Sequence, residues 1–399
     1  MDLAGISGLL TEQGWALLES LPPYREDDAL GLGEQLRAAG HDPALVAAAL
    51  TQSRLRSAAR AKFGPFADGM LFTVTGLEQA TRFSVAARHA QRFVSAGIDR
   101  VADLGCGIGA DSMALATFDR EVLAVERDEV TAAVATMNLR HWPEASVRCA
   151  DATTVDLAGF GGAFVDPARR NETGKRLLDP RLGSPPLSFV LDLAQRLPAV
   201  GLKTAPGIPH HLVPAGAEAQ WISVGGDVVE AGLWFGLTAR DGVRRSALVL
   251  PAEGDESPPA EVSDAGMPAA TVGPVAAYLY EPDGAVIRAG LVGQVAAAVG
   301  GHLVDPTIAY VTGEALVRTP LARAYAVQDV FGFQLKTLRS WLRDRGVGRL
   351  TIKKRGTAVQ PEQLRKQLRL STSWGEADAT IVLTRVAGRQ SVIAVRPVL

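Results

Sequence analysis

Short apolar strands alternate with helical segments between residues 100 and 237, and this alternation constrains the fold more than any other feature of the sequence. Helical segments fill most of the gaps between the strands, and strands joined in this way form parallel sheets with helices on both faces. The sequence therefore predicts a doubly wound α/β sheet with an antiparallel edge. The expected strands are residues 100–106, 120–127, 146–151, 162–167, 199–205, 219–225 and 231–237.

The regions before this sheet have helical patterns. Residues 1–74 show helical apolar spacing and predict an all-helical N-terminal region. A capping box at Thr75 then predicts one helix that runs to Gly97. We assign residues 75–250 to a single α/β domain.

The regions after the sheet differ in composition. Residues 251–270 hold five acids, four prolines and no basic residue, which favours a flexible linker or a surface loop. Residues 271–314 form a connecting region. Residues 315–399 carry 16 Lys and Arg against 5 Asp and Glu, a local charge of +11 in a chain whose net charge is −2. Such a block indicates a separate basic domain, which either contacts nucleic acid or is simply a solvated surface.

Overall composition is that of a soluble globular protein, with 47% hydrophobic and 21% charged residues in 399. The first residues lack a basic segment followed by a long apolar run, so we expect a cytoplasmic protein without a membrane segment. Two cysteines, Cys106 and Cys149, are too few for a disulfide framework or a zinc site, and we expect no metal.

A glycine-rich turn follows the first expected strand. Asp103 precedes Gly105, Gly107 and Gly109, and glycines at such a turn let a ligand approach the backbone while the next helix supplies N–H donors. The spacing differs from the dinucleotide fingerprint, and Asp103 would repel a pyrophosphate. A nicotinamide cofactor is therefore disfavoured, and a cationic nucleoside cofactor fits better.

Three further carboxylates end the next three strands. Glu126 lies where a carboxylate accepts hydrogen bonds from ribose hydroxyls, Asp151 where one accepts a hydrogen bond from an adenine amino group, and Asp166 follows on the next strand. Each is also compatible with an ordinary strand end or turn. Together they predict one crevice at the carboxyl edge of the sheet.

These motifs resemble the class I S-adenosylmethionine-dependent methyltransferases. The matching segments are "DLGCGIG" (103–109), Glu126 in "VLAVERDE", Asp151 in "CAD" and "VDPARR" (165–170). The resemblance implies a Rossmann-like sheet, with Asp103 and the glycine turn at the methionine end of S-adenosyl-L-methionine. It also places Glu126 at the ribose and Asp151 at the adenine.

The segment before the sheet resembles the helix that covers the methionine end in RNA-modifying members, including trimethylguanosine-synthase-like enzymes. Gln79 is the contact that this resemblance suggests.

In amino-methylating relatives the strand end at Asp166 reads Asp, Asn or Ser, then Pro-Pro and an aromatic residue. Here Asp166 and Pro167 match, but Ala168 and Arg169 replace the second proline and the ring. We take Asp166, Pro167 and Arg169 as the candidate catalytic residues. The arginines at 169 and 170 would stack on a base or hold a phosphate. The alternative is a turn with two solvated arginines, and the departure puts an N-methyl product in doubt.

The C-terminal block resembles the THUMP-like domain, a small α+β domain that follows such methyltransferase domains in bacteria, and THUMP domains bind RNA. The candidate RNA-binding residues are Lys353, Lys354 and Arg355, together with Lys336, Arg339 and Arg343 of an amphipathic helix.

The leading hypothesis is a methyltransferase that acts on RNA. The alternatives are a methyltransferase for a small molecule or protein, and an RNA-binding protein whose crevice holds cofactor without turnover. Lys203 could reach the expected crevice, but a solvated strand end is favoured for it. His210 and His211 could supply a base, but no partner residues accompany them, and two ordinary loop histidines are favoured.

Overall fold

The computed structural model describes residues 3–168, 179–267, 269–370 and 374–398. The chain forms two compact units, one of residues 1–218 and 230–241 and the other of residues 219–229 and 242–399. Arg169 and Arg170 lie outside the described residues, so the candidate role of Arg169 stays a prediction.

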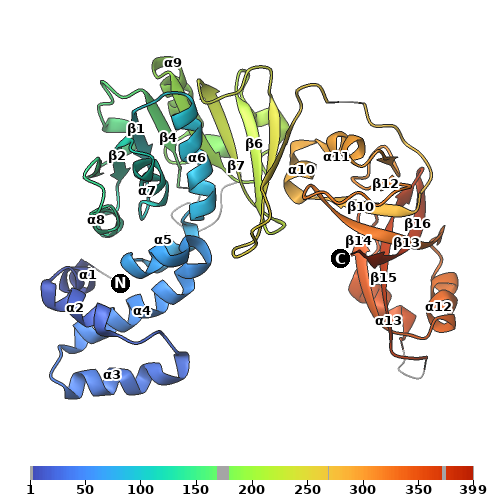
Figure 1. The fold of residues 1–399 in the computed structure, drawn as a ribbon, viewed down its shortest axis with the longest axis horizontal. Helices are drawn as coiled ribbons and strands as arrows, with labels where there is room; N and C mark the ends of the chain where they lie inside the picture. The colour runs from blue at the N-terminus through green and yellow to red at the C-terminus, as the bar shows by residue number, and fades with distance from the viewer. Residues whose placement is uncertain (1–2, 169–178, 268, 371–373, 399) are drawn as a thin grey trace. The chain divides into compact units, whose positions relative to one another are not determined.

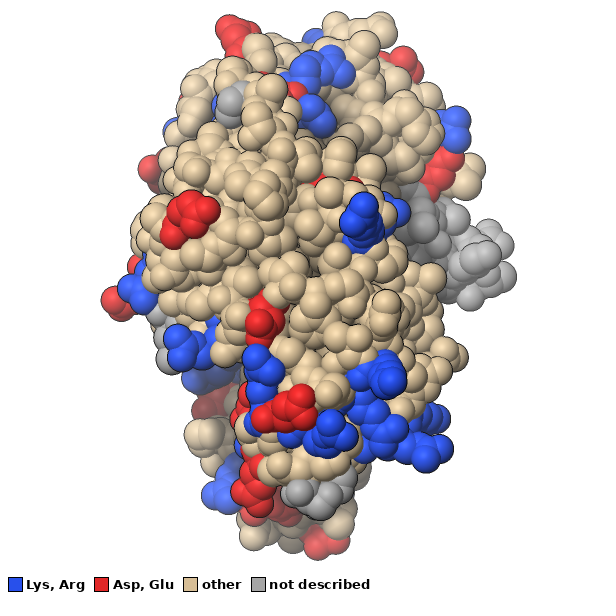
Figure 2. All heavy atoms as spheres, turned by 90° about the vertical axis from the view of Figure 1, so that its right-hand side faces the viewer, with Lys and Arg blue, Asp and Glu red and all other residues tan. Residues whose placement is uncertain are grey.

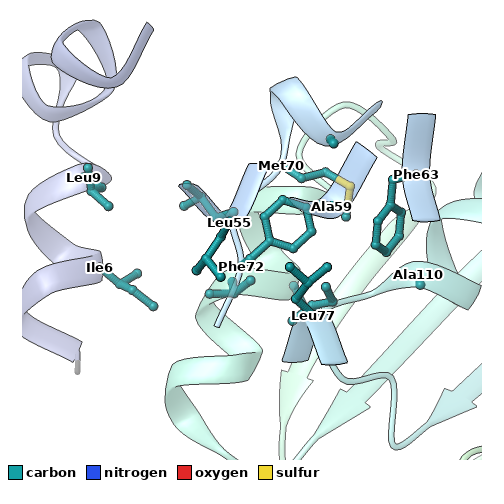
Figure 3. Close-up of a cluster of buried hydrophobic side chains, with 14 of the residues drawn as sticks. Ile6, Leu9, Leu55, Ala59, Phe63, Met70, Phe72, Leu77 and Ala110 are labelled. Atoms are coloured by element: carbon teal, nitrogen blue, oxygen red, sulfur yellow. The ribbon is translucent and has the colours of Figure 1, made fainter. Parts of the chain in front are cut away.

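The first unit begins with helices, as the apolar spacing predicts. Asp42 caps the long helix α4, where its side chain accepts a hydrogen bond from the Leu45 N–H. The buried side chains of Figure 3 include Leu55, Phe63 and Phe72, which form one apolar core with residues of the helices that follow the sheet strands. The helices are α1 (Leu3–Leu9), α2 (Glu12–Ser20), α3 (Ala29–Ala38) and α4 (Pro43–Phe63), with short turns η1 (Glu26–Asp28) and η2 (Gly64–Gly69).

The single helix expected from Thr75 to Gly97 is wrong, because the structure has two helices there. Helix α5 (Val74–Gln79) is capped by Thr73, and helix α6 (Phe83–Ser95) starts after a break at residues 80–82. No glycine or proline marks this break. Lys62 stabilises the break, since its ammonium donates to the carbonyl oxygens of Leu77, Glu78 and Ala80 at the end of α5.

Six strands of the first unit form a sheet in the order β3-β2-β1-β4-β5-β7 (Figure 1). The first four neighbouring pairs are parallel and β7 is antiparallel to β5. The predicted doubly wound sheet is confirmed. Its antiparallel strand is β7, the last strand of this order within the first unit. Its strands are β1 (Arg100–Leu104), β2 (Glu121–Glu126), β3 (Ala145–Cys149), β4 (Gly162–Val165), β5 (Ala199–Thr204) and β7 (Asp227–Gly236). The connecting helices are α7 (Ala110–Thr117), α8 (Glu129–Asn138) and α9 (Leu187–Arg196), with short turns η3 (Ala152–Thr154), η4 (Pro180–Leu182) and η5 (His210–Leu212).

The second unit contains two groups of strands. In the first group β6 (Glu218–Val224) is parallel to β8 (Arg245–Leu250), and β8 is antiparallel to β9 (Ala260–Ser263). Strand β9 lies inside the segment 251–270 that we expected to be a linker or surface loop. Four residues beside two prolines carry too little pattern to show a strand in the sequence.

The second group is a seven-stranded sheet in the order β11-β12-β10-β13-β16-β15-β14. Because β10 pairs with β13, residues 271–314 share this sheet with residues 315–399, and the expected boundary at 314/315 falls within it. Its strands are β10 (Tyr278–Pro282), β11 (His302–Leu303), β12 (Val311–Gly313), β13 (Ala322–Gly332), β14 (Val347–Lys354), β15 (Ala377–Val386) and β16 (Arg389–Pro397). The helices of this unit are α10 (Gly284–Ala289), α11 (Val292–Ala298), α12 (Leu335–Asp344) and α13 (Pro361–Leu368).

The two faces of β14 carry different side chains. Leu350 packs with Leu338 of α12 and Leu364 of α13, so both helices cover the face to which Leu350 points. Lys353 pairs in register with Val382, whose side chain belongs to a separate apolar cluster. Since successive side chains of a strand point to opposite faces, Lys353 lies on the face away from α12.

In the described part of the chain, no helix combines the length and the apolarity that a membrane crossing needs.

Candidate active site

The glycine turn after β1 has a backbone that only glycine adopts easily. Gly105, Gly107 and Gly109 have φ of +87°, +54° and +89°. The Gly105 N–H donates to the Val125 carbonyl oxygen at 2.9 Å, and a Cβ at Gly105 would collide with the Asp166 carbonyl oxygen. Around Gly107 the space is open. The turn thus brings the ends of β1, β2 and β4 together and leaves room over its middle glycine.

Asp103 is buried beneath this turn. Its Oδ2 accepts a hydrogen bond from the Ser112 hydroxyl at 2.5 Å, while its Oδ1 has no hydrogen-bond partner among the described residues. Burial, and next the charge of Asp111, raise the pKa of Asp103 to about 8. A buried carboxyl with one unused oxygen is suited to a cation, whose charge would favour the ionised form.

Glu126 ends β2 and reaches the glycine turn. Its Oε2 accepts from the Gly107 N–H at 3.2 Å and its Oε1 from the Asp128 N–H at 2.9 Å. The structure therefore brings Glu126 and the glycine turn together, and the contact of Glu126 with a ribose stays a prediction.

Asp151 follows β3 and is exposed. Its Oδ1 accepts from the Thr153 N–H and hydroxyl, and these hydrogen bonds lower the pKa of the carboxyl. The Ala150 N–H donates to the Glu126 carbonyl oxygen at 3.0 Å, which sets Asp151 beside the end of β2. Asp151 is both a turn cap and a neighbour of the crevice, so its adenine contact stays a prediction.

Asp166 ends β4, next to the glycine turn. Its N–H donates to the Leu104 carbonyl oxygen at 3.0 Å, and Pro167 behind it is buried. The Asp166 carboxylate is 23% exposed and accepts a hydrogen bond from the Lys203 ammonium at 2.7 Å. The sequence interpretation of Lys203 as a solvated strand end is wrong, because this side chain is only 4% exposed.

Lys203 is one end of a buried polar chain that the sequence interpretation missed. Its ammonium also donates to the Thr81 hydroxyl at 2.7 Å, and Thr81 donates to Asp111 Oδ2 at 2.7 Å. His89 Nδ1 lies 2.8 Å from Asp111 Oδ1, and its Nε2 lies 2.8 Å from Glu230 Oε1. The second contact is an ion pair without good hydrogen-bond alignment.

The charges in this chain support one another. Burial alone lowers the pKa of His89, but the charge of Glu230 and the hydrogen bond to Asp111 raise it to about 9. Burial likewise lowers the pKa of Lys203, yet the charge of Asp166 and then that of Glu230 bring it above its usual value. Both cations therefore remain charged near neutral pH.

The chain is 32% identical over 340 residues to an uncharacterized S-adenosylmethionine-dependent methyltransferase of Mycobacterium tuberculosis, in strains CDC 1551 and H37Rv. The matched region covers 83% of this chain and 90% of the relative. The chain belongs to the S-adenosylmethionine-dependent methyltransferases.

The fold and the flanking regions agree with this family. A crystal structure of a candidate methyltransferase from Porphyromonas gingivalis W83 matches with a TM-score of 0.72 at 18% identity, covering 95% of this chain and 100% of that one. Residues 322–397 match the THUMP domain-like family, which confirms the resemblance of the C-terminal block. Residues 2–59 match a domain of unknown function, DUF8688.

The residues at the carboxyl ends of β1 and β2 fit the cofactor of this family. S-adenosyl-L-methionine supplies an activated methyl group on a positively charged sulfur and also carries an ammonium group. The unused Oδ1 of buried Asp103 suits positive charge, the open space at Gly107 admits a ligand to the backbone, and Glu126 stands beside both. These are the residues that would hold it. Metal ligation has no comparable support, since the described residues contain no cluster of three or more His, Cys, Asp or Glu side chains able to hold an ion.

Gln79 lies at the last position of α5 and is exposed. Its neighbour Thr81 belongs to the buried chain, so α5 ends close to residues of the crevice. The contact of Gln79 with cofactor stays a prediction.

The structure does not bring the six candidate RNA-binding residues onto one surface. Lys353 is tied to Glu281 at 2.6 Å on the face away from α12, and Arg355 lies over the Tyr310 ring. Lys354 is exposed and donates to the Val359 carbonyl oxygen. The separation has a physical reason, because alternation along β14 sends Lys353 and Lys354 to opposite faces.

The three basic residues of α12 remain together. Lys336, Arg339 and Arg343 are exposed and spaced by three and four positions, which places them on one side of the helix. The Arg339 guanidinium lies 5.8 Å from the centroid of the Trp374 ring. In Figure 2, Lys and Arg gather in the lower part of the view with Asp and Glu beside some of them.

Proposed function

We propose that this methyltransferase modifies RNA and that the exposed side of α12 contacts the phosphate backbone. The observation that carries the proposal is the combination of a THUMP domain-like match over residues 322–397 with three exposed cations along one helix of that region. THUMP domains bind RNA, and clustered Lys and Arg supply the sequence-independent part of RNA affinity.

Trp374 adds a second argument for single-stranded RNA. Trp374 is a partly exposed residue that packs against the apolar core, and the Arg339 guanidinium lies over its ring. Aromatic rings and guanidinium planes next to cations are the groups on which unpaired bases stack. An acidic protein partner would use the cations but not the ring.

In the crevice, the chain's own residues would bind and orient the reactants. Asp166 stands at the end of β4 as a fixed carboxylate that accepts a hydrogen bond from the group to be methylated. Its backbone is held by Leu104 and its side chain by Lys203. Most of the rate enhancement would come from holding donor and acceptor in line at close range.

The experiment that tests the proposal measures methyl transfer to RNA. Labelled S-adenosyl-L-methionine is incubated with the protein and total RNA from a strain that lacks it, and the RNA is digested to nucleosides. A labelled nucleoside is the expected result. Labelling confined to protein or to small molecules of an extract would instead support those acceptors, and cofactor binding without any labelling would support a protein that does not turn over.

A charge variant tests the α12 surface. Lys336→Gln, Arg339→Gln and Arg343→Gln together should reduce the slope of log affinity against log salt for single-stranded RNA by about 2, at roughly 0.7 per phosphate contact. The matched control removes three cations from the helical region of the first unit with Arg25→Gln, Arg37→Gln and Arg54→Gln, all of which are exposed. Equal slopes for the wild type and the α12 variant would contradict the proposed surface.

A further inference from the structure

The buried chain from Lys203 to Glu230 has only one consistent direction of hydrogen bonding. The Thr81 hydroxyl has a single proton, which it donates to Asp111, so it must accept from the Lys203 ammonium. The ammonium donates a second hydrogen to Asp166. Lys203 is therefore a donor in both contacts, and Asp166 is the acceptor that faces the crevice.

The other end of the chain is fixed by packing. The His89 ring lies 4.7 Å from the Phe164 ring and 5.6 Å from the Trp234 ring, measured between centroids. Its nitrogens lie between Asp111 and Glu230, both of which are buried. An imidazolium held between two carboxylates and two aromatic rings has little freedom to move, so it anchors Asp111 and, through Thr81, the lysine.

We propose that Lys203 is a positioning residue for methyl transfer: anchored through Thr81 to Asp111 and His89, its ammonium holds the Asp166 carboxylate ionised and in one orientation at the crevice. The methyl acceptor then presents a hydrogen to that carboxylate. This inference rests on the proposed role of Asp166 at the methyl acceptor, but it does not depend on the acceptor being RNA.

The location of the pair supports this role over a purely structural one. Burying a lysine is costly, and a well-packed apolar pair of similar volume is often as stable as a buried ion pair. Lys203 is 4% exposed while its partner Asp166 is 23% exposed. The lysine of this ion pair is thus buried in the protein, and its aspartate is partly exposed on the side where the reactants would bind.

The proposed role agrees with the atom balance of methyl transfer to an N–H or O–H group. A lone pair of the acceptor atom forms the new bond to the methyl carbon, and the carbon–sulfur bond breaks with its electrons left on sulfur. The acceptor's proton leaves to solvent water. An ionised Asp166 orients the acceptor through that hydrogen, whereas a protonated Asp166 would offer a competing donor.

The contact itself is tested by NMR on the full chain labelled with ¹⁵N at lysine Nζ. We expect a slowly exchanging ammonium signal that is lost in Lys203→Arg and displaced in Asp166→Asn. The signal of Lys62, whose ammonium binds three carbonyl oxygens, is the internal control and should not move in Asp166→Asn. The absence of a protected Lys203 signal would overturn the proposal.

The positioning role is tested by kinetics with labelled S-adenosyl-L-methionine and an extract of a strain that lacks the protein. The extract is not desalted, so that it keeps its small molecules as well as its RNA and proteins. Lys203→Met should lower the rate at saturating cofactor at least tenfold at pH 7 and move the acid limb of its pH profile upward by one unit or more. The dissociation constant for S-adenosylhomocysteine should change less than threefold. Lys203→Arg, which keeps the charge, should recover part of the rate.

A second variant covers the case in which Lys203→Met does not fold. Thr81→Val keeps the shape of the side chain, removes the link to Asp111 and should lower the rate in the same way with less effect on folding. If a folded Lys203→Met or Thr81→Val protein has the same rate and the same acid limb as the wild type, the Lys203–Asp166 pair is structural only. If the labelled methyl group is found in protein or small molecules of the extract and not in RNA, the RNA proposal is refuted, but the test of Lys203 remains valid.

Discussion

Asp103→Asn is the substitution that most directly tests the electrostatics of the crevice. Asp103 is 1% exposed, and its raised pKa of about 8, against an ordinary value of 3.8, means that the folded protein holds its proton between these pH values while the unfolded chain releases it. Folding therefore takes up a proton in this window, and stability falls as the pH rises from about 4 to about 8. Asn resembles the protonated acid, since its amide oxygen can accept the Ser112 hydrogen bond.

The size of the effect follows from the shift. Each pKa unit corresponds to about 1.4 kcal/mol. Relative to Asp103→Asn, the wild type should therefore lose up to roughly 1.4 kcal/mol of unfolding free energy for each pH unit in that window, and on the order of 5 kcal/mol across the whole window. Near pH 4 the two proteins should differ by about 1 kcal/mol or less, the usual scale for a conservative change.

Denaturant unfolding of the full chain at pH 5, 6.5 and 8 measures this difference. Because a bound ligand stabilises the unit that binds it, the unfolding transition that S-adenosylhomocysteine shifts is assigned to the cofactor-binding unit. The control variant is Asp192→Asn, which changes an exposed aspartate of α9. If the unfolding free energies of the wild type and Asp103→Asn change with pH in parallel, the reasoning is refuted. It is also refuted if the wild type gains stability relative to the variant as the pH rises, because Asp103 would then be ionised and stabilised by its neighbours.

The same carboxyl predicts a proton linked to cofactor binding. S-adenosyl-L-methionine carries more positive charge than S-adenosylhomocysteine, so its binding should release a larger fraction of the Asp103 proton near pH 7. Calorimetry in two buffers with different ionisation heats measures that fraction. Equal proton release for both ligands would show that the carboxyl does not respond to the sulfur's charge.

Two further substitutions separate cofactor binding from transfer. Glu126→Ala should weaken S-adenosyl-L-methionine binding by about 1.5–3 kcal/mol in calorimetry, the scale of hydrogen bonds to a charged group, and an unchanged affinity would remove Glu126 from the cofactor site. Asp166→Asn should abolish methyl transfer while cofactor affinity stays within about 1 kcal/mol, since Asp166 is assigned to the acceptor side; loss of affinity together with activity would assign it to the cofactor shell or the fold.

The sequence was sufficient for the sheet and for one side of the crevice because both follow from local patterns. Apolar runs of four to six residues define β1, β2, β4 and β5, and glycines at positive φ mark the turn at Gly105 to Gly109. Glu126 lies beside this turn because the end of the neighbouring parallel strand must lie at the same edge, and its contact with a ribose stays a prediction. Each of these inferences needs only a strand, its end and the next strand.

The basic surface was misjudged for the opposite reason. Lys353, Lys354 and Arg355 are consecutive, and we treated them as one patch, but a strand directs consecutive side chains to opposite faces. The direction of Lys353 becomes clear only in the folded sheet, where β14 pairs with β15 and the Lys353 ammonium donates to the Glu281 carboxylate.

The buried chain of Lys203 could not be found from local patterns, because its members are scattered along the sequence. They lie in helices α6 and α7, in strands β5 and β7, in the break between α5 and α6, and directly after β4. Thr81 and Lys203 are separated by 122 residues along the chain, and Lys203 and Asp166 by 37. Taken singly, each member has an ordinary explanation: a helix-end threonine, a histidine on an apolar helix face, a lysine at a strand end. What the sequence does contain is an inconsistency in "AVGLKTA", where a lysine stands between apolar residues in a strand that is buried along its whole length. A buried strand tolerates a charge only when other charges meet it, so Lys203 implies partners at the carboxyl edge of the sheet. Since β4 is the parallel neighbour of β5, Asp166 is the nearest carboxylate that the topology offers, and the pair is what the fold requires once the strand order is known.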